Sequence, residues 1–337
     1  MRADVSVIMP VLNEERHLRA AVDGVLAQDH PGELEVLLAV APSTDRTREI
    51  AEQMAAEDPR IVVLDNPTGA TPAGLNVAID AARYDVVVRV DGHGELSEGY
   101  IATAVRLLEE TGAANVGGLM DAQGFSPFSE AVAAAYNSRL GLGGGGFHLE
   151  NTPAGPADTV FLGVFRRDAL RDVGGFDESL HRAQDWELNY RLRRAGHLVY
   201  FSPDLRVVYR PRDSVADLAR QFYRTGQWRR EVIRRHVDTV SLRYLAPPVT
   251  VLGVVVGLLG GALGLALRSR WLTALLVAPA VYLAFVLVGT ASMRGLSPAA
   301  RLRVPLVLTV MHLSWGLGFL RGLPVSQRPR IARASRG

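Results

Sequence analysis

Short runs of β-branched and aliphatic residues alternate, over the first 110 residues, with longer segments whose apolar positions recur at helical spacing. The short runs predict strands at 5–9, 34–40, 61–64 and 85–90. The longer segments predict helices near 15–28, 44–56, 72–83 and 98–110. Such alternation is typical of βαβ units, and strands that are apolar on both faces are typical of a parallel sheet covered by helices on both sides. We therefore expect an α/β domain with a mostly parallel sheet.

The C-terminal part of the chain has a different pattern, with three long apolar runs at 245–267, 271–292 and 304–320. A helix needs roughly 20 apolar residues to cross the hydrocarbon of a bilayer, so the first two runs are long enough and the third is marginal. The first run also contains glycines at near-helical spacing, which would let a neighbouring helix approach closely, or would simply make a Gly-rich helix that faces lipid; the spacing leaves both open. The pattern predicts a transmembrane region of two to three helices over 244–322, followed by an Arg-rich tail over 323–337.

The N-terminal and C-terminal parts of the chain also differ sharply in net charge. Residues 1–238 contain 26 Arg against 35 Asp and Glu, a net charge of −9, whereas residues 239–337 contain 11 Arg and no acid, a net charge of +11. A long apolar segment whose only charges are cationic is typical of a membrane region next to anionic headgroups. Although the sequence pI is about 9.1, the acidic character of residues 1–238 argues against nucleic-acid binding.

Two residue types are absent, since all 37 Lys and Arg positions are Arg and there is no Cys. These absences exclude Schiff-base chemistry, a Walker-type phosphate lysine, a thiol nucleophile, a disulfide and Cys-ligated zinc. The eight His and the 35 Asp and Glu remain for acid–base catalysis and metal binding.

The arginines also bear on membrane topology. The apolar stretch at 5–12 is too short for a secretory signal and contains Pro10, so we expect the α/β domain to stay in the cytoplasm. Three full spans would place the tail arginines outside, against the positive-inside tendency. Two spans plus a re-entrant or interfacial third segment keep the tail inside together with the loop of Arg294, Arg301 and Arg303, and we favour this arrangement. The tail arginines are Arg321, Arg328, Arg330, Arg333 and Arg336.

Candidate chemistry follows the predicted strands, because ligands bind at the carboxyl ends of the strands in open α/β sheets. Asp91, Gly92 and His93 come directly after the fourth strand. A carboxylate and an imidazole two residues apart can converge on one divalent cation, which in turn can hold a diphosphate. The plain alternative is a turn Asp followed by a surface His, and the spacing alone leaves both open.

Residues 141–146 satisfy the GxGxxG pattern of dinucleotide-binding turns. That pattern requires a strand before it and a helix after it, whereas a helical pattern at 129–140 precedes it here. We therefore interpret the segment as a loop and expect it near the active site.

Four segments occur in order along residues 4–235: VSVIMPVLNEE, PSTDRT, VRVDGH and AQDWELNYRLRRAG. With these segments the chain resembles the family-2 glycosyltransferases, which bind nucleotide sugars with a domain of the GT-A fold. It is most similar to their bacterial exopolysaccharide branch, of the succinoglycan-synthesis type, in which a cytoplasmic catalytic domain is followed by a few membrane helices. The resemblance implies a Rossmann-like GT-A catalytic domain over 1–212 in a multi-pass protein of the bacterial plasma membrane.

The resemblance also implies residues that bind the donor. Pro10, Asn13, Glu14 and Asp45 would line the uridine pocket. Asn76 would also approach the donor. Taken alone, Asp45 fits the N-terminal cap of a helix and Asn76 is an ordinary helix residue.

A cation site is implied by the same resemblance. Asp91 and His93 match the Asp-x-Asp metal motif of the family, with His in place of the second Asp, and Asp91 also belongs to the donor site. Imidazole suits Mn²⁺ at least as well as Mg²⁺, so the expected cofactor is a divalent cation, Mn²⁺ or Mg²⁺.

The segment QDWELNYRL at 184–192 resembles the acidic motif of the family, with Gln184 where many members have Glu. The resemblance assigns the role of general base to Asp185 and places Gln184 on the acceptor side. A carboxylate would take the proton from the attacking sugar hydroxyl, and attack opposite the leaving diphosphate would invert the anomeric configuration. Taken alone, Asp185 would be an ordinary exposed acid of a helix.

Residues 213–237 combine apolar positions at helical spacing with many arginines, and predict a basic amphipathic helix on the membrane surface. With the linker behind it, this segment covers 213–243. Gln221, Arg224 and Trp228 resemble the acceptor-side Gln-x-x-Arg-Trp motif of processive relatives, with the Trp displaced by three residues.

We therefore expect a membrane-anchored inverting glycosyltransferase that transfers a hexose from a nucleotide sugar, a UDP-sugar, to a lipid-linked saccharide in exopolysaccharide or cell-envelope glycan synthesis. Its partners would be the donor, the lipid-linked acceptor and membrane lipids, with no nucleic acid. A polyprenyl-phosphate sugar synthase is the alternative among enzymes. A catalytically silent nucleotide-sugar-binding membrane protein is the alternative outside them.

Overall fold

The structure is a computed structural model that describes residues 3–143 and 145–325. The last four arginines of the expected tail therefore lie outside the described residues: Arg328, Arg330, Arg333 and Arg336.

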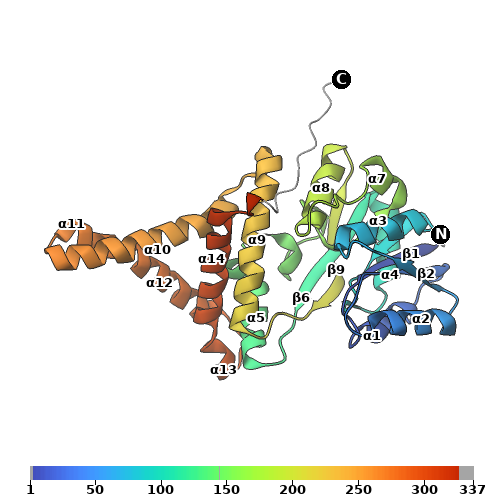
Figure 1. The fold of residues 1–337 in the computed structure, drawn as a ribbon, viewed down its shortest axis with the longest axis horizontal. Coiled ribbons are helices and arrows are strands. Elements are labelled where there is room, and N and C mark those ends of the chain that lie inside the picture. Colours follow the sequence, from blue (N-terminus) through green and yellow to red (C-terminus); the bar gives the residue numbers. More distant parts are fainter. Residues whose placement is uncertain (1–2, 144, 326–337) are drawn as a thin grey trace, which may run out of the picture. The chain divides into compact units, whose positions relative to one another are not determined.

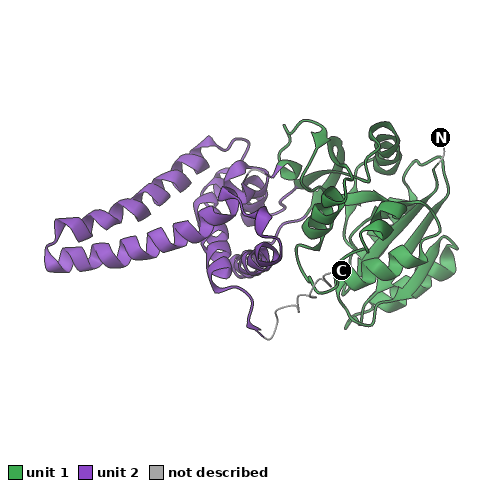
Figure 2. Cartoon of the chain, turned by 90° about the horizontal axis from the view of Figure 1, so that it is seen from above, with its two compact units in different colours: residues 1–121, 146–209 green, residues 122–145, 210–337 purple. Residues whose placement is uncertain are grey.

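The chain forms two compact units (Figure 2). Unit 1 comprises residues 1–121 and 146–209, and unit 2 comprises residues 122–145 and 210–337. The expected catalytic domain over 1–212 ends close to the end of unit 1, but residues 122–145 group with the C-terminal helices. Glu130 explains part of this grouping, because its carboxylate accepts hydrogen bonds from the backbone N and the Oγ of Ser297, at 2.7 and 2.6 Å.

Unit 1 is built on a sheet in which nine strands are described (Figure 1). They are β1 Val5–Val11, β2 Leu34–Val40, β3 Ile61–Asp65, β4 Val86–Arg89, β5 Glu95–Leu96, β6 Asn115–Ala122, β7 Gly155–Pro156, β8 Phe161–Arg166 and β9 Val199–Tyr209. Their order is β3-β2-β1-β4-β8-β6-β9-β5, with β7 paired to β9. β1 to β4 pair in parallel, whereas β8 is antiparallel to β4 and β6, and β9 to β5 and β7. The four predicted strands are thus confirmed, and antiparallel strands extend the sheet beyond them.

Helices cover both faces of this sheet, and the alternation of side chains along each strand decides which face a residue joins. Val7 and Met9 of β1 pack in one cluster with α1 (Leu18–Leu26), α2 (Thr47–Glu57) and α4 (Tyr100–Thr111). Ile8, between them, packs in a second cluster with α3 (Thr71–Ala81), α7 (Arg167–Asp172) and α8 (Gln184–Arg194). All three side chains are fully buried, and each such burial stabilises the fold by about 1.5–3 kcal/mol.

Two helices begin later than the sequence pattern predicts. α1 begins at Leu18 rather than near residue 15, and α2 begins at Thr47 rather than near residue 44. The residues before them hydrogen-bond to each other instead, since Glu14 N donates to Oγ1 of Thr47 at 2.7 Å and Arg46 N donates to Oε2 of Glu15 at 3.2 Å. They form two interlocked loops after β1 and β2.

Unit 2 is helical. Its helices are α5 Pro127–Tyr136, α6 Arg139–Leu142, α9 Val215–Arg235, α10 Leu242–Leu267, α11 Arg270–Thr273, α12 Val277–Ser292, α13 Pro298–Arg301 and α14 Val304–Arg321, with 3-10 turns at Val237–Thr239 and Ala274–Leu276. Among the residues that the structure describes, three stretches are long and apolar enough to cross a membrane: Leu242–Leu267, Arg270–Ser292 and Pro298–Arg321. The GxGxxG segment begins inside α6, at Gly141, and ends in a 3-10 turn at Gly146–His148, so the interpretation as a loop is wrong at its two ends. A helix precedes it, so its context is not that of a dinucleotide-binding turn, and its place near the active site stays a prediction.

α10 and α12 form a long hairpin (Figures 1 and 2). A Cβ on Gly257 would lie 2.5 Å from Cδ of Pro279, and one on Gly264 would lie 2.3 Å from the backbone N of Thr273. The glycines of the first apolar run therefore allow the returning chain to approach, which decides between the two alternatives that their spacing left open. Most of the hairpin surface is exposed, since only 22% and 11% of its two most apolar windows are buried.

α14 lies beside α9 (Figure 1). The backbones approach closely, because a Cβ on Gly318 would lie 1.9 Å from the carbonyl oxygen of Tyr223 and one on Gly226 would lie 2.0 Å from that of Trp315. The apolar stripe that we expected on the membrane surface is therefore largely covered inside unit 2, and α14 is the most buried of the three apolar stretches, at 39%. The covered side chains of α9 are Leu218, Phe222, Trp228 and Val232.

Candidate functional site

The carboxyl ends of β1, β2 and β4 lie at one edge of the sheet, because these strands are parallel. Pro10 lies in β1 opposite Ala39 of β2. Asn13 follows with a φ of 57°, its Oδ1 accepts a hydrogen bond from the backbone N of Thr44 at 2.8 Å, and its own N donates to Oγ of Ser43 at 3.1 Å. Asn adopts this left-handed conformation more readily than most residues, so it can both turn the chain and join the two loops.

Asp45 is held by the same loops. Its carboxylate accepts hydrogen bonds from Oγ1 and N of Thr47 and from N of Glu15, at 2.5, 3.1 and 3.2 Å. The hydrogen bond from the Thr47 hydroxyl is the main reason that the pKa of Asp45 lies below its ordinary value. Asp45 thus closes the turn before α2 as an ionised group, and its contact with the donor stays a prediction.

Asp91 and His93 follow β4 at this edge of the sheet. Nδ1 of His93 lies 2.8 Å from Oε1 of Glu14, so two candidate residues from different motifs meet. Gly92 permits this approach, because a Cβ there would lie 3.0 Å from Cγ of Glu14. The structure therefore brings the loops after β1 and β4 together at the expected place.

A divalent cation would find two suitable protein ligands here, the carboxylate of Asp91 and the imidazole of His93, whose side chains are 30% and 50% exposed. Within the described residues, no group of three or more His, Asp and Glu side chains could hold a metal ion. One oxygen and one nitrogen ligand fit a cation whose other ligands come from a substrate diphosphate and water.

Arg89 joins this group to a residue far along the chain. It is the last residue of β4, lies opposite Ile8 of β1, and has a side chain that is only 6% exposed. Its Nη2 donates to Oδ1 of Asp91 at 3.0 Å, and its Nη1 donates to Oδ1 of Asp185. Its guanidinium also lies 6.0 Å from the ring centroid of Phe176. A planar fork of N–H donors can hold two carboxylates at once, so Arg89 ties Asp185 to the candidate metal ligand Asp91.

Asp185 lies in the first turn of α8, and its side chain is 40% exposed. The neighbouring acid Glu187 is buried and pairs with Arg191, whose guanidinium also donates to the carbonyl oxygens of Val173 and Gly175. Glu187 therefore fixes α8 to the preceding loop, whereas the carboxylate of Asp185 can be reached from solution.

Asn76 contacts the same preceding loop. Its Nδ2 donates to the carbonyl oxygen of Phe176 and to Oε1 of Glu178, both at 2.9 Å, and its Oδ1 accepts from N of Phe176 at 2.8 Å. The structure thus gives Asn76 a role in positioning Phe176, whose ring lies near Arg89. Its approach to the donor stays a prediction.

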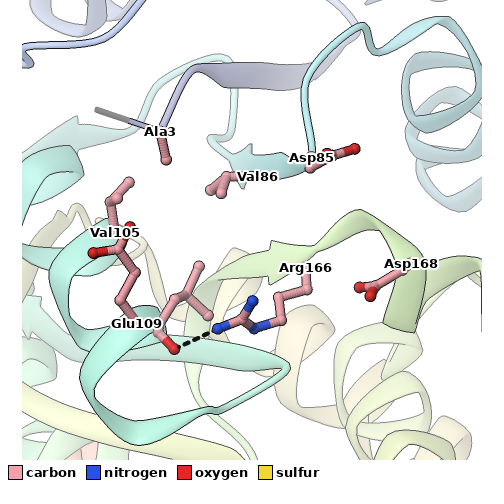
Figure 3. A pocket seen from close by; sticks show the side chains of 8 residues that line it. Ala3, Asp85, Val86, Val105, Glu109, Arg166 and Asp168 are labelled. Carbon is pink, nitrogen blue, oxygen red and sulfur yellow. Dashed lines mark hydrogen bonds between the residues drawn. The ribbon is translucent and has the colours of Figure 1, made fainter. Parts of the chain in front are cut away.

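A hollow of about 370 Å³ lies elsewhere in unit 1 (Figure 3). Its lining includes Ala3, Asp85, Arg166 and Asp168. Asp85 precedes β4 whereas Asp91 follows it, so this hollow lies at the opposite end of the strand from the candidate residues, and none of them lines it.

The sequence matches the family described as Glycosyl transferase family 2 over residues 6–174. The chain belongs to this family. It is 33% identical to the succinoglycan biosynthesis protein ExoA of Rhizobium meliloti (strain 1021), over 97% of this chain and 96% of the relative. It is 22% identical to dolichyl N-acetyl-alpha-D-glucosaminyl phosphate 3-beta-D-2,3-diacetamido-2,3-dideoxy-beta-D-glucuronosyltransferase of Methanococcus voltae, over 68% of this chain and 74% of the relative.

A solved glycosyltransferase has a similar fold. The mannosyltransferase PcManGT from Pyrobaculum calidifontis, in complex with GDP-Man and Mn²⁺, has a TM-score of 0.59 at 20% identity, over 95% of this chain and 87% of that chain. The GT-A fold predicted for this family-2 glycosyltransferase is thus confirmed. The family match contains the segments with Asn13, Asp45 and Asp91 but ends before α8, so the role of Asp185 stays a prediction.

The acceptor-side candidates of this glycosyltransferase belong to both units. Gln184 is the first residue of α8 in unit 1, next to Asp185. Gln221, Arg224 and Trp228 lie on α9 in unit 2, where Arg224 is exposed and Trp228 is 7% exposed. A buried Trp contributes to helix packing, so the structure gives Trp228 a packing role and leaves its contact with an acceptor a prediction.

Arg89 is absent from the residues that the sequence singles out, although the sequence contains a signal for it. It interrupts the apolar run VVVRV of a strand that is covered on both faces. A charge in such a strand needs partners, because burial of an unpaired charge is costly. The partners could have been sought among the acids of the other motifs.

Proposed function

We propose that this family-2 glycosyltransferase transfers a hexose from a nucleotide sugar, a UDP-sugar, to a lipid-linked saccharide in the synthesis of an exopolysaccharide or another cell-envelope glycan. The observation that carries the proposal is the exposed carboxylate of Asp185, tied through Arg89 to Asp91 at the carboxyl edge of the sheet. The names of two relatives support the acceptor class, since one refers to succinoglycan biosynthesis and the other to a dolichyl sugar phosphate.

Asp185 accepts the proton of the acceptor hydroxyl while the hydroxyl oxygen bonds to the anomeric carbon. The bond from that carbon to the donor diphosphate breaks in the same step, and the nucleoside diphosphate leaves with the electron pair. Attack opposite the leaving group, with no covalent intermediate, inverts the anomeric configuration. Arg89 fixes the direction of the Asp185 carboxylate through its hydrogen bond.

A divalent cation, when bound, neutralises charge on the leaving diphosphate. Asp91 and His93 would hold it, and Glu14 orients the His93 ring through Nδ1. We expect activity to require a divalent cation and to be at least as high with Mn²⁺ as with Mg²⁺, because His93 supplies a nitrogen ligand. His93→Asp should shift the preference toward Mg²⁺, measured as the ratio of initial rates in the two metals.

His197→Ala is the matched control for this experiment, since His197 is a partly exposed histidine of unit 1 that contacts a carboxylate, Asp172, at 2.9 Å. Its metal preference should equal that of the parent enzyme. Binding of Mn²⁺ alone, followed by electron paramagnetic resonance, should weaken in His93→Ala and not in the control. Full activity in EDTA would remove the cation from the mechanism, and an unchanged metal preference in His93→Asp would remove His93 from the site.

The proposed reaction is tested by incubating membranes that contain the enzyme with a panel of labelled nucleotide sugars and following the label into the lipid extract. We expect one UDP-sugar to label a lipid-linked oligosaccharide. Label from a GDP-sugar would contradict the donor assignment. A single sugar on a polyprenyl phosphate would favour the polyprenyl-phosphate sugar synthase instead, and label found only in water-soluble product would contradict a lipid-linked acceptor.

The proposal includes two membrane spans, α10 and α12, with α14 at the membrane surface and unit 1 in the cytoplasm. The exposed apolar hairpin and the greater burial of α14 beside α9 support this arrangement. A single Cys placed after Arg336 of this Cys-free chain should react with an impermeant thiol reagent only after cells are permeabilised. Arg270→Cys, between the two spans, should react in intact cells, and labelling of the tail from outside would establish three spans.

A further inference from the structure

Two arginines and three aromatic rings gather in unit 2 at the base of α10. Cζ of Arg229 lies 4.1 Å from the ring centroid of Tyr244, and Cζ of Arg243 lies 4.5 Å from the same centroid while its Nη2 donates to the Tyr244 hydroxyl. Tyr244 stacks on Trp315 with centroids 6.5 Å apart and planes at 16°, and Trp315 stacks on Phe319 at 5.4 Å and 12°. The rings of α10 and α14 thus form one continuous stack, and the guanidinium groups of Arg229 and Arg243 lie against Tyr244 at one end of it.

The positive charges of Arg229 and Arg243 repel each other. Guanidinium groups held against one ring repel, and the repulsion grows where water is excluded. Nη1 of Arg229 is buried, and burial lowers the pKa of Arg229, while Tyr244 raises it and Arg243 lowers it further. The buried acid of α9, Glu231, pairs with two other arginines of that helix. An anion bound between the two guanidinium groups would offset their repulsion.

The cluster lies where the chain enters its first apolar span. Val237, Val240 and Leu242 are 71%, 45% and 86% exposed. Ser241, between them, occupies the position before α10, and its buried Oγ has no hydrogen-bond partner within the described part of the chain. Exposed apolar side chains around buried polar groups are typical of a surface that meets the boundary between headgroups and acyl chains.

We propose that Arg229 and Arg243 bind the phosphate or diphosphate headgroup of a membrane lipid, whose chain lies along the exposed apolar residues at the base of α10. Arginine binds phosphate with charge-assisted, bidentate hydrogen bonds, and stacking on an aromatic ring keeps its planar fork in place. The headgroup of the lipid-linked acceptor is the ligand that the proposed function supplies, and this identification rests on that function. Anionic phospholipid offers the same chemistry.

The test measures binding of radiolabelled farnesyl diphosphate to the purified full-length protein in a neutral detergent. Arg243→Gln should weaken binding by about 10- to 100-fold, because charge-assisted hydrogen bonds to the phosphate are lost. Arg229→Lys keeps the positive charge but loses the planar fork, so it should weaken binding less than Arg243→Gln does. Arg270→Gln is the matched control, since Arg270 also lies over an aromatic ring, 5.2 Å from that of Trp271, at the other end of α10.

Competitors identify the source of the phosphate. If neither phosphatidylglycerol nor inorganic pyrophosphate displaces farnesyl diphosphate at equal concentration, the result supports the assignment of the site to the acceptor headgroup. Equal displacement by phosphatidylglycerol supports the lipid phosphate site but overturns its assignment to the acceptor. Equal displacement by pyrophosphate overturns the lipid part of the proposal. Equal binding by Arg243→Gln, Arg229→Lys and the Arg270→Gln control overturns the site itself.

This measurement fails separately from the proposed function, because binding requires no sugar transfer. If labelled donors reach the lipid extract while Arg243→Gln binds farnesyl diphosphate as the control does, the site is wrong and the function stands. If binding depends on both arginines while no donor labels lipid, the function is wrong and the site stands.

Discussion

Replacing Asp185 with Asn is expected to lower turnover by about 10²–10⁴-fold while the affinity for the donor stays nearly unchanged. The amide keeps the shape of the side chain and can still accept the hydrogen bond that Arg89 donates. It cannot take the proton of the acceptor hydroxyl. Initial rates at saturating substrates and donor titrations on the purified full-length enzyme measure the two quantities separately.

Asp85→Asn is the matched control for this prediction. Asp85 is also a carboxylate paired with an arginine, Arg167, but it precedes β4 at the opposite end of the strand and is 93% exposed. Its turnover should equal that of the parent. If Asp185→Asn kept turnover within about tenfold of this control, the loss would fall short of what removal of a general base costs, and Asp185 would not be the base.

The parallel half of the sheet could be predicted from the sequence because its elements are local. Each of β1 to β4 is a short apolar run separated from the next by a helical segment, and periodicity identifies both. Helix starts were less predictable. Glu14 and Thr47, 33 residues apart, hydrogen-bond to each other before α1 and α2 begin, and a pattern within one segment contains no sign of that contact.

The antiparallel half depends on pairings that periodicity does not encode. β8 inserts between β4 and β6, and β9 pairs with β5 and β7, over long separations along the chain. Between β6 and β8 the chain also leaves unit 1 and returns to it. The apolar stripe of α9 could be recognised from the sequence, because its residues recur at helical spacing. Such a stripe predicts a buried face, but it does not show whether lipid or α14 covers that face.

The candidate site, like the sheet, could be predicted from the sequence only in part. Asn13, Asp45, Asp91 and His93 follow strands, so the rule that ligands bind at the carboxyl ends of strands places them at one edge of the sheet. The link from this edge to Asp185 spans 96 residues through Arg89 and exists only after the sheet and α8 have packed. The motif resemblance identified Asp185, whereas the structure identified Arg89 as the residue that orients it.

Arg89→Lys is therefore expected to lower turnover by about 10²-fold, which is what a misplacement of about 1 Å at a reacting group can cost. The Lys ammonium can approach one carboxylate, but it lacks the planar fork with which Arg89 contacts both Asp91 and Asp185. Donor affinity should change much less than turnover, because the backbone after β4 keeps a hydrogen bond that does not involve Arg89, from N of Gly94 to the carbonyl oxygen of Asp91 at 2.8 Å. Arg167→Lys, which alters a similar arginine–carboxylate pair at the other end of β4, should keep the parental turnover.

A double-mutant cycle distinguishes positioning of the base from a general effect on folding. If Arg89 acts by orienting Asp185, Arg89→Lys should cause little further loss of turnover in a chain that already contains Asp185→Asn, because the base it would orient is absent. If Arg89 only stabilises unit 1, the two losses should multiply, and both single variants should unfold at lower temperature than the Arg167→Lys control. Multiplying losses would thus leave Arg89 as a structural residue, whereas non-additive losses would establish that the buried arginine of β4 and the exposed acid of α8 act as one catalytic unit.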